Sequence, residues 1–521
     1  MAQASNRDIS VALAYHEATK HSYTSVRSVG HVLDWSNRPL PYKIYPGAGT
    51  LALPRELSLS STSTLNVLRQ RSGFRQKPPD LETLTRLLFC AGGLTKRANV
   101  GGEDYHFRAA ASAGALYPVE LYLVAGEIEG VERGLYHFLP ADLKLHGLRR
   151  GDWRPYLARC AASSSVRDAA AVFIMTSIFW RSAWKYRARA YRYCFWDTGT
   201  ILANLLGAAN ADAIDTKIIT AFNDRSIEEL LEVDGEREGV VCLVAIGNTT
   251  VSSSTAQPNE AGGFDSVARA STMLTSMELE SIPLSAKEVI YEELVKLQRA
   301  SRLVEPEEVS ELSQVQFEPT RLETCSAQIM LDRAADDEAK GLGETILRRG
   351  STRAFAQEAI AAKELAAILA TSNARTDGDL AQIAETYLIV NAVEGLVPGT
   401  YYYRRDSGTF ELLKAGDFRA EAGYLCLEQP LGADCSALII YMIDLERTLK
   451  AFGNRGYRNA HLDAGLLGGR AYLASYSLGR GATGLTFYDD DTTAFFQPHS
   501  EKMSPALMIA LGVPLSRNSA T

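Results

Sequence analysis

The stretch YRYCFWDTG, residues Tyr191–Gly199, recurs later in the chain as YRNAHLDAG, residues Tyr457–Gly465. The two segments share a Tyr-Arg-x4-Asp-x-Gly pattern at an offset of 266 residues. Four more matches keep the same order at an offset of 265: Glu120-Leu-Tyr122 with Glu385-Thr-Tyr387, Gly134-Leu-Tyr136 with Gly399-Thr-Tyr401, Gly151-Asp152-Trp153 with Gly416-Asp417-Phe418, and Ala245-Ile-Gly247 with Ala510-Leu-Gly512. An ordered series with almost constant spacing indicates a duplicated domain.

The duplication divides the chain into four parts. We expect an N-terminal extension (1–64), a first domain (65–250), a linker (251–340) and a second domain (341–521). The aromatic and proline spacing of the extension favours an extended segment draped over the domain. The linker opens with a stretch rich in Ser, Thr, Gly and Asn, and continues through charged, helix-compatible sequence at 286–303.

Each copy has the pattern of an α+β fold. A helix is expected after Asp80, which is a plausible N-cap. Short β-like runs lie at 120–124, 170–176 and 240–246. A long, mostly apolar helix is expected to start near Asp197, and its glycine-containing twin near Asp463. Small residues let another backbone approach, so we expect these helices to pack together about a pseudo-twofold axis, like a homodimer fused into one chain.

Composition limits the class of protein. The 521 residues are 46% hydrophobic and 22% charged, with a formal net charge of −8, which fits a soluble globular chain and argues against a nucleic-acid partner. No apolar run reaches the roughly 20 residues of a membrane span, and no secretory signal is visible. The seven cysteines lack a Cys-x-x-Cys pair and the histidines lack metal spacing. We therefore expect a reduced, cytoplasmic protein with no membrane partner and no metal.

Arginines cluster at the start of the second copy. Arg348, Arg349 and Arg353 surround Ser351, and such guanidinium and hydroxyl donors suit a phosphate monoester. A solvated basic patch is the alternative. A related arginine cluster at 69–75 opens the first copy, and this recurrence favours the phosphate site.

Two small-residue loops are candidates for contact with a flat ligand. The first runs from Ser112 through Gly114 to Tyr117 and leads into a strand, where exposed amides can bond a heterocycle edge; a tight turn explains it equally well. The second is the glycine-dense segment 479–485 of the second copy. The acidic run at 489–491 that follows fits a helix start better than a metal site.

Lys185 and Tyr186 form a candidate proton-transfer pair, provided that burial or positive neighbours lower their pKa values. A surface lysine beside a core tyrosine is the alternative.

Together these motifs resemble the FMN-dependent nitroreductase superfamily, and more narrowly its SagB/ThcOx branch. The opening segments Tyr15–Ser22 and Asp34-Trp35 are also similar to that branch. The resemblance implies an α+β fold of two tandem nitroreductase-like domains forming an intramolecular pseudo-dimer, with FMN at the interface of the two domains. It also implies oxidation of heterocycles, best known as conversion of azolines to azoles in ribosomally made peptides.

The resemblance further implies one FMN per chain. In such dimers the arginines and the late glycine-rich loop come from one subunit, and the Ser-x-Gly loop comes from the other. At the 265 offset, Ser112–Gly114 falls on Asp377–Asp379, and Gly481–Leu485 has no glycine-rich counterpart around 216–220, so only one composite site survives. Arg71 and Arg75 are then relics or salt-bridge formers. The flavin contacts that the resemblance implies are Arg348, Arg349, Ser351, Arg353, Ser112, Ala113, Gly114, Tyr117, Gly481, Thr483, Gly484 and Leu485.

Lys185-Tyr186 also matches a Lys-Tyr pair that azoline-oxidising enzymes need, whereas the second copy has Lys450-Ala451-Phe452 without the phenol. The leading hypothesis is an FMN-dependent dehydrogenase or oxidase of an azoline-like bond in a peptide or small molecule, with a modification complex as a further partner. One alternative is a nitro- or quinone-reductase fed by NAD(P)H. Another is a catalytically inactive scaffold of such a complex.

Overall fold

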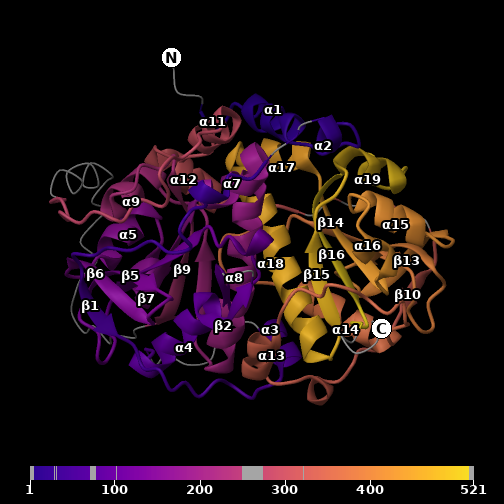
Figure 1. Cartoon of the computed structure of the whole chain (residues 1–521), viewed down its shortest axis with the longest axis horizontal. Helices are drawn as coiled ribbons and strands as arrows, with labels where there is room; N and C mark the ends of the chain where they lie inside the picture. The colour runs from indigo at the N-terminus through magenta and orange to yellow at the C-terminus, as the bar shows by residue number, and fades with distance from the viewer. Residues whose placement is uncertain are drawn as a thin grey trace.

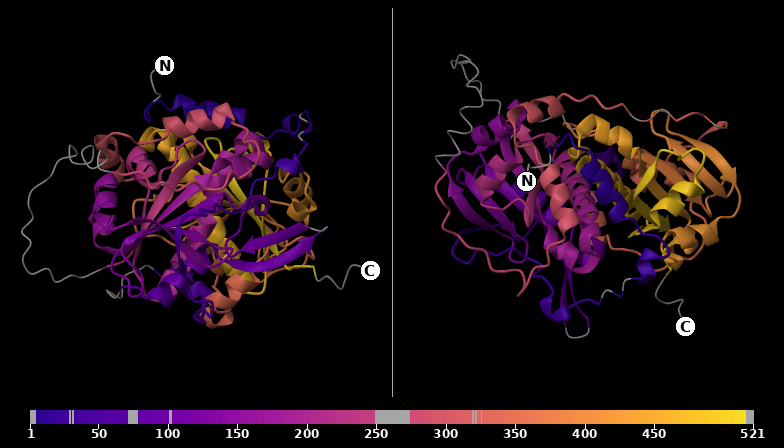
Figure 2. Two further views of the ribbon diagram at one scale, coloured as in Figure 1. Left: turned by 60° about the vertical axis from the view of Figure 1, so that its left-hand side comes forward. Right: turned by 90° about the horizontal axis from the view of Figure 1, so that it is seen from above.

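The computed structural model describes residues 5–28, 30, 32–70, 78–100, 103–248, 274–318, 320, 322–324 and 326–515. The molecule has two lobes that lie side by side, with two long helices crossing between them (Figure 1). The view from above in Figure 2 shows one sheet in each lobe, on either side of these helices. Arg71 and Arg75, together with the Ser- and Thr-rich start of the linker, lie outside the described residues.

Each lobe contains a seven-stranded antiparallel sheet. The first has the order β1-β6-β5-β4-β7-β9-β8 and the second the order β10-β13-β12-β11-β14-β16-β15, which is the same pattern repeated. The first sheet consists of β1 Gly49–Ala52, β4 Val119–Ala125, β5 Gly134–Leu139, β6 Lys144–Arg150, β7 Ala169–Ile178, β8 Thr216–Ile219 and β9 Glu238–Asn248. The second consists of β10 Gln328–Met330, β11 Glu385–Val390, β12 Gly399–Arg404, β13 Thr409–Ala415, β14 Ala437–Ile443, β15 Gly481–Leu485 and β16 Ser504–Gly512. The predicted duplication, the α+β class and the three β-like runs are therefore confirmed.

Helices pack against both sheets. The first lobe has α3 Thr64–Arg69, α4 Leu81–Gly92, α5 Arg154–Cys160, α6 Ser164–Arg167, α7 Phe179–Tyr186, α8 Ala190–Ala211 and α9 Asp224–Leu231. The second has α13 Leu342–Arg348, α14 Ala362–Ser372, α15 Arg419–Leu425, α16 Pro430–Asp434, α17 Leu445–Phe452, α18 Arg455–Ser477 and α19 Asp489–Phe495. Asp80 caps α4 as predicted, because its carboxylate accepts the Thr83 N–H at 2.9 Å.

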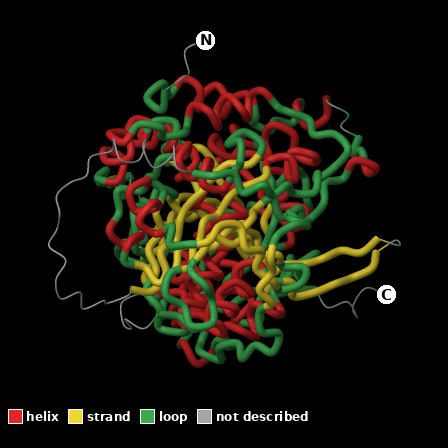
Figure 3. Tube along the Cα trace, turned by 90° about the vertical axis from the view of Figure 1, so that its left-hand side faces the viewer, coloured by secondary structure: helices red, strands yellow, loops and turns green. Residues whose placement is uncertain are grey.

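The N-terminal segment and the chain that connects the two lobes are partly helical. The N-terminal segment carries α1 Ser10–Ala18 and α2 Ser25–Ser28, and the chain between the lobes carries α11 Glu292–Ala300 and α12 Pro306–Ser313. The sequence predicted an extended N-terminal segment, and this is wrong for the parts that form α1 and α2. A separate ribbon, β2 Leu94–Val100 paired with β3 Glu103–Arg108, projects from the body (Figure 3). No helix among the described residues has the length and apolar character of a membrane span.

The long helices α8 and α18 cross at two glycines, as the small residues predicted. A Cβ atom on Gly199 would lie 2.3 Å from the backbone nitrogen of Leu466, and one on Gly465 would lie 2.5 Å from the carbonyl oxygen of Trp196. Both helices begin seven or eight residues earlier than predicted, at Ala190 and Arg455. The first turns were missed because they carry arginines that are buried by ion pairs with the opposite lobe.

Gly465→Ala is expected to lower the free energy of unfolding by about 1–3 kcal/mol or more, because overpacking here must push two backbones apart. Gly207→Ala on α8 is the matched control, since its new Cβ would meet flexible side-chain ends and no backbone, with Leu68 at 2.9 Å and Leu342 at 3.5 Å. Alanine also favours helix over glycine by up to about 1 kcal/mol. Thermal unfolding of both variants checks this; equal melting temperatures would contradict the backbone contact.

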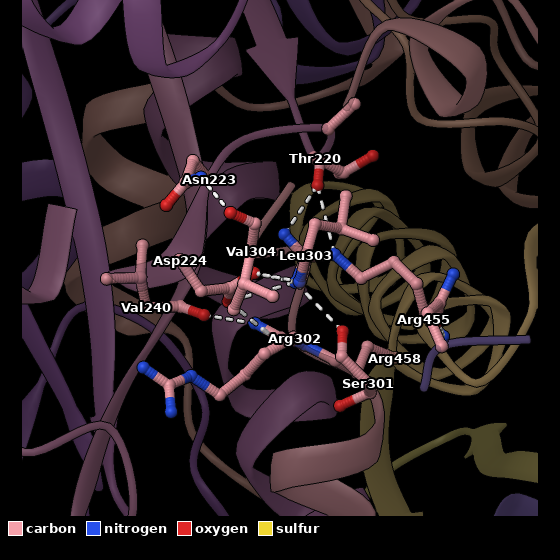
Figure 4. Close-up of polar contacts among 12 residues, drawn as sticks. Thr220, Asn223, Asp224, Val240, Ser301, Arg302, Leu303, Val304, Arg455 and Arg458 are labelled. Atoms are coloured by element: carbon pink, nitrogen blue, oxygen red, sulfur yellow. Dashed lines mark hydrogen bonds and ion pairs between the residues drawn. The ribbon is translucent and has the colours of Figure 1, made fainter. Parts of the chain in front are cut away.

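Two buried ion clusters join the lobes in a reciprocal way. Asp224 at the start of α9 pairs with Arg455 at 2.7 Å and with Arg458 at 3.0 Å, both on α18 of the other lobe (Figure 4). Asp489 at the start of α19 pairs with Arg189 at 2.9 Å and with Arg192 at 2.7 Å, just before and within α8. The predicted helix start at Asp489 is confirmed, and its carboxylate has an additional role between the lobes.

The segments before the two domains take equivalent places at these clusters. The backbone N–H of Leu303 donates to Asp224, and that of His21 donates to Asp489, each at 2.8 Å. Arg455 donates to the carbonyl of Ser301, as Arg189 does to the carbonyl of Thr19. The pseudo-twofold relation therefore extends to the chain around α1 and α11.

Candidate functional site

The Ser112–Tyr117 loop is held by one carboxylate of the long helix α8. Asp197 accepts the Ser112 hydroxyl at 2.5 Å and the Ala113 N–H at 3.0 Å. The Ser112 oxygen in turn accepts the Tyr117 N–H at 2.9 Å. This pairing fixes a bend in which Gly114 has a φ of +63°, a value that favours glycine.

The helix α7 brings Lys185 and Tyr186 to this bend. A Cβ atom on Gly114 would lie 2.8 Å from the Tyr186 hydroxyl and 3.3 Å from the Lys185 amine. The Tyr186 ring stacks on Tyr193 of α8, with ring centroids 4.3 Å apart. Residues that are about 70 positions apart in the sequence thus form one cluster at the surface, where Gly114 and Lys185 are exposed.

The second lobe contributes arginines to the same region. Arg349 follows α13, and its guanidinium donates to the carbonyls of Ala109 at 2.9 Å and Arg108 at 2.8 Å, just ahead of the Ser112 loop. Partial burial of the Lys185 amine lowers its pKa most, although much of the residue is exposed, and the charge of the exposed Arg353 lowers this pKa further. Arg349 thus joins the lobes, while Arg353 influences the lysine through its charge.

The other predicted second-lobe residues are placed as follows. The Ser351 hydroxyl lies 3.5 Å from the Tyr472 hydroxyl, which accepts the N–H of Gly484 on the edge strand β15. Gly484 is exposed, whereas the remaining predicted residues of β15 are buried: Gly481, Thr483 and Leu485. The Arg348 side chain is 65% exposed and pairs with Glu344 at 3.2 Å.

The pseudo-symmetric position is closed by main-chain contacts. Asp377 and Asp379, at the place of the Ser112 loop in the second copy, bond with β8 of the first lobe: the Asp377 carbonyl accepts the Ile218 N–H, and the Asp379 N–H donates to the Ile218 carbonyl, each at 3.0 Å. The Asp379 carboxylate accepts the N–H groups of Thr220 at 2.6 Å and Ala221 at 3.0 Å. Gly378 lets the chains approach, since a Cβ there would lie 1.9 Å from the Ile218 oxygen.

The second lobe also lacks the lysine and tyrosine. Helices α7 and α17 correspond at an offset of 266, and each ends on a residue with positive φ, Arg187 at 54° and Gly453 at 67°. Ala451 and Phe452 therefore take the places of Lys185 and Tyr186. Lys450, the first residue of the segment that the sequence placed opposite the pair, lies one residue before the position of Lys185 and forms an exposed ion pair with Glu446 at 2.5 Å.

Comparison with known proteins decides the family. The profile of the Nitroreductase family matches residues 70–248 and 346–512, which is most of both lobes. The chain belongs to the nitroreductase family. A crystal structure from Anabaena variabilis, described as a nitroreductase, has a TM-score of 0.75 and 27% identity, and the match covers 97% of this chain and 99% of that one.

Two relatives of this chain have names that state a role. The trifolitoxin-processing protein TfxB of Rhizobium leguminosarum bv. trifolii is 32% identical over 161 residues, which is 30% of this chain and 43% of TfxB. The microcin B17-processing protein McbC of Escherichia coli is 22% identical over 227 residues, which is 42% of this chain and 79% of McbC.

Neither Asp197 nor Tyr472 was predicted from the sequence to have a role at the site. Asp197 belongs to the repeated Tyr-Arg-x4-Asp-x-Gly motif, and its recurrence as Asp463 was the available signal. Asp463 accepts two backbone N–H groups, from Ile383 at 2.8 Å and Ala384 at 2.9 Å, so both copies use the aspartate to hold the chain that enters a central strand. No such signal marks Tyr472. Among the described residues, no group of histidine, cysteine and acidic side chains is arranged to hold a metal ion.

Asp197→Asn is expected to gain stability relative to the native protein as the pH rises. Burial raises the pKa of Asp197 to about 7, despite the hydrogen bonds from Ser112 and Ala113. An unfolded aspartate ionises near pH 4, so the native protein loses stability between about pH 4 and pH 7, whereas asparagine does not ionise. Denaturant unfolding at pH 5 and pH 8, at matched flavin content, is expected to show a difference of about 1–3 kcal/mol between the two pH values. Parallel stability profiles would contradict it.

Proposed function

We propose that this nitroreductase-family protein is an FMN-dependent dehydrogenase or oxidase with one composite active site per chain. The observation that carries the proposal is that Gly114 packs against Lys185 and Tyr186 in the first lobe, while Arg353 of the second lobe lies near enough to influence the charge of Lys185. The pseudo-symmetric position supports a single site, because Asp377–Asp379 fills it with main-chain contacts to β8.

The residues present fit a flavin phosphate. Lys185 and Arg353 come from different lobes, influence each other electrostatically, and form no ion pair with any residue in the described part of the chain. The Arg353 guanidinium, which has no acidic partner among the described residues, favours binding of an anion between the lobes. Gly114 and Gly484 are exposed and carry no side chain, so neither would obstruct a flat ring that lies against its backbone. Arg353 and Ser351 are the proposed phosphate contacts, with Arg348 at the rim, while Arg349 holds the two lobes together at the site.

The two catalytic candidates have different roles. The chemistry that a bound FMN would supply is the acceptance of one hydride, that is two electrons and a proton, from the substrate. The lowered pKa of Lys185 raises the fraction of neutral amine that can take a proton from the substrate carbon. Burial and the neighbouring Tyr193 and Asp197 raise the pKa of Tyr186, so its phenol stays protonated and donates a hydrogen bond. Lys185 is thus the proposed base and Tyr186 the proposed orienting donor.

The proposed substrate is an azoline-like ring in a peptide or small-molecule intermediate. TfxB and McbC are both named for the processing of a peptide product, and their similarity to this chain supports a peptide substrate and a modification-complex partner. Loss of a proton and a hydride from a thiazoline or oxazoline gives the aromatic azole.

Flavin content and substrate oxidation test the proposal. The purified chain is expected to carry about one FMN per polypeptide, identified by its visible absorbance and mass, and to convert a synthetic thiazoline peptide to the thiazole with loss of two mass units. Two FMN per chain would overturn the single site. A colourless protein that does not bind added FMN would overturn the enzyme and leave the scaffold alternative.

A reductase remains the second candidate, because the Anabaena variabilis structure that matches almost the whole chain is described as a nitroreductase. Anaerobic mixing with NADPH separates the two activities. Rapid bleaching of the flavin, together with no oxidation of the thiazoline peptide, would replace the first proposal by this one.

A further inference from the structure

One buried arginine connects the helix of the catalytic pair to the loop that it faces. Arg181 lies in the first turn of α7 and its side chain is only 1% exposed. Its guanidinium donates to the carbonyls of Leu40 at 3.0 Å and Tyr117 at 3.1 Å, and it forms an ion pair with Glu120 on β4. A single planar group thus bonds the N-terminal segment, the end of the Ser112–Tyr117 loop and the sheet.

Glu120 is itself held in place from the other side. Its second carboxylate oxygen lies 2.7 Å from Nε2 of His137 on β5. Although burial raises the pKa of Glu120, the neighbouring Arg181 and His137 outweigh it and hold the pKa well below its usual range. The carboxylate is therefore a fixed anion inside the sheet, and Arg181 is anchored to it.

The position of Arg181 on α7 connects its ion pair with Glu120 to the placement of Lys185. Arg181 and Lys185 are four residues apart, so they lie one above the other on the same face of α7. The contacts of Gly114 with Lys185 and Tyr186 leave little room for α7 to shift. Fixing the first turn of the helix thus fixes the amine that sits one turn later.

In the second lobe the residues that correspond to Arg181 and Glu120 do not form this ion pair. At the 266 offset the counterpart of Arg181 is Arg447, which donates to the carbonyl of Glu318 at 2.9 Å. The counterpart of Glu120 is Glu385, which pairs with Arg405 at 2.9 Å instead. The lobe that lacks the lysine and tyrosine keeps the arginine and the glutamate, but they no longer bond to each other.

We infer that Arg181 is a positioning residue that, anchored by Glu120, holds Lys185 and Tyr186 against the Ser112–Tyr117 loop. The inference rests on the proposed function for its effect on turnover, but the placement of Lys185 can be measured without turnover.

The first measurement is the reactivity of the Lys185 amine in the FMN-loaded protein. Competitive acetylation with acetic anhydride over a range of pH, read by mass spectrometry, gives the titration midpoint and accessibility of this lysine. The charged and titratable groups that face it are Arg353 and Tyr186. In Arg181→Gln the midpoint is expected to move up towards that of an ordinary lysine, because α7 no longer holds the amine in its partly buried place near Arg353. The matched control Arg447→Gln is expected to leave it unchanged.

The second measurement is turnover of the synthetic thiazoline peptide. Arg181→Gln is expected to lower kcat by about 10- to 100-fold, with a smaller change in KM, because a displacement of about 1 Å costs that much. Arg181→Lys keeps the charge but lacks the fork that serves three acceptors, so partial recovery is expected. If Arg181→Gln does not fold, Glu120→Gln replaces it, since it removes the anion and keeps the shape.

A folded Arg181→Gln with native kcat and a native Lys185 midpoint overturns the inference, and so does an Arg447→Gln that changes Lys185 equally. Failure of the proposed function gives a different result: the native protein does not oxidise the thiazoline peptide, yet the Lys185 midpoint still responds to Arg181 and not to Arg447.

Discussion

Lys185→Ala is expected to lower turnover of a thiazoline peptide by about 10²- to 10⁴-fold while FMN stays bound, which is the usual contribution of a general base. The amine lies beside Gly114, and its partial burial together with the charge of Arg353 lowers its pKa. In the native protein kcat is therefore expected to rise with pH, with a midpoint below the pKa of an ordinary lysine, which is about 10.4. The alanine variant loses this pH dependence along with the rate.

Tyr186→Phe is expected to have a smaller effect, about 10- to 100-fold, because the phenol donates a hydrogen bond and keeps its proton. Phenylalanine fits this backbone position, since Phe452 occupies its counterpart in the second lobe. Lys450→Ala is the matched control for charge and is expected to leave turnover unchanged. Full activity in both Lys185→Ala and Tyr186→Phe would refute the catalytic assignment, and loss of FMN from Lys185→Ala would make the lysine a cofactor contact instead.

The duplication and the pairing of the long helices could be predicted because they leave local signals. Repeated motifs at a constant offset give the two lobes, and small residues in Tyr457–Gly465 and its continuation give the close crossing. The start of α8 could not be predicted, because Arg192 looks like a surface residue in the sequence. Only the opposite lobe supplies the Asp489 carboxylate that lets it be buried.

At the site, too, local sequence features could be predicted, whereas contacts between distant segments leave no local signal. The composition of the Ser112–Tyr117 loop marked it as a candidate, but its neighbours Lys185 and Arg353 come from another helix and another lobe. At the pseudo-symmetric position the sequence predicted only that the second copy lacks the Ser-x-Gly motif, and not that other residues fill its place. That Asp379 actively fills it depends on bonds to Thr220 and Ala221, more than 150 residues away, which no local pattern reports.

The other large effect concerns the buried ion clusters between the lobes. Asp224→Ala is expected to lower the free energy of unfolding by about 3–5 kcal/mol, because it leaves Arg455 and Arg458 buried without their carboxylate. Asp489→Ala is expected to cost a similar amount through Arg189 and Arg192. Asp490→Ala is the matched control: that side chain is 74% exposed in its pair with Lys20, and such surface pairs contribute about 0–1 kcal/mol.

The two clusters are equivalent in structure but differ in what lies next to them. The Arg189 guanidinium sits 5.2 Å from the Phe487 ring centroid, just beyond β15, and Tyr193 on α8 donates to Thr486 at 3.2 Å while stacking on Tyr186. The Asp224 cluster instead adjoins β8, where Asp379 closes the pseudo-symmetric position. Asp489→Ala is therefore expected to weaken FMN binding as well as stability, whereas Asp224→Ala lowers stability alone. Flavin titration alongside denaturant unfolding separates these effects. Equal loss of FMN affinity in both variants would contradict this, because FMN affinity would then depend on the association of the lobes as a whole and not on the cluster that lies next to β15.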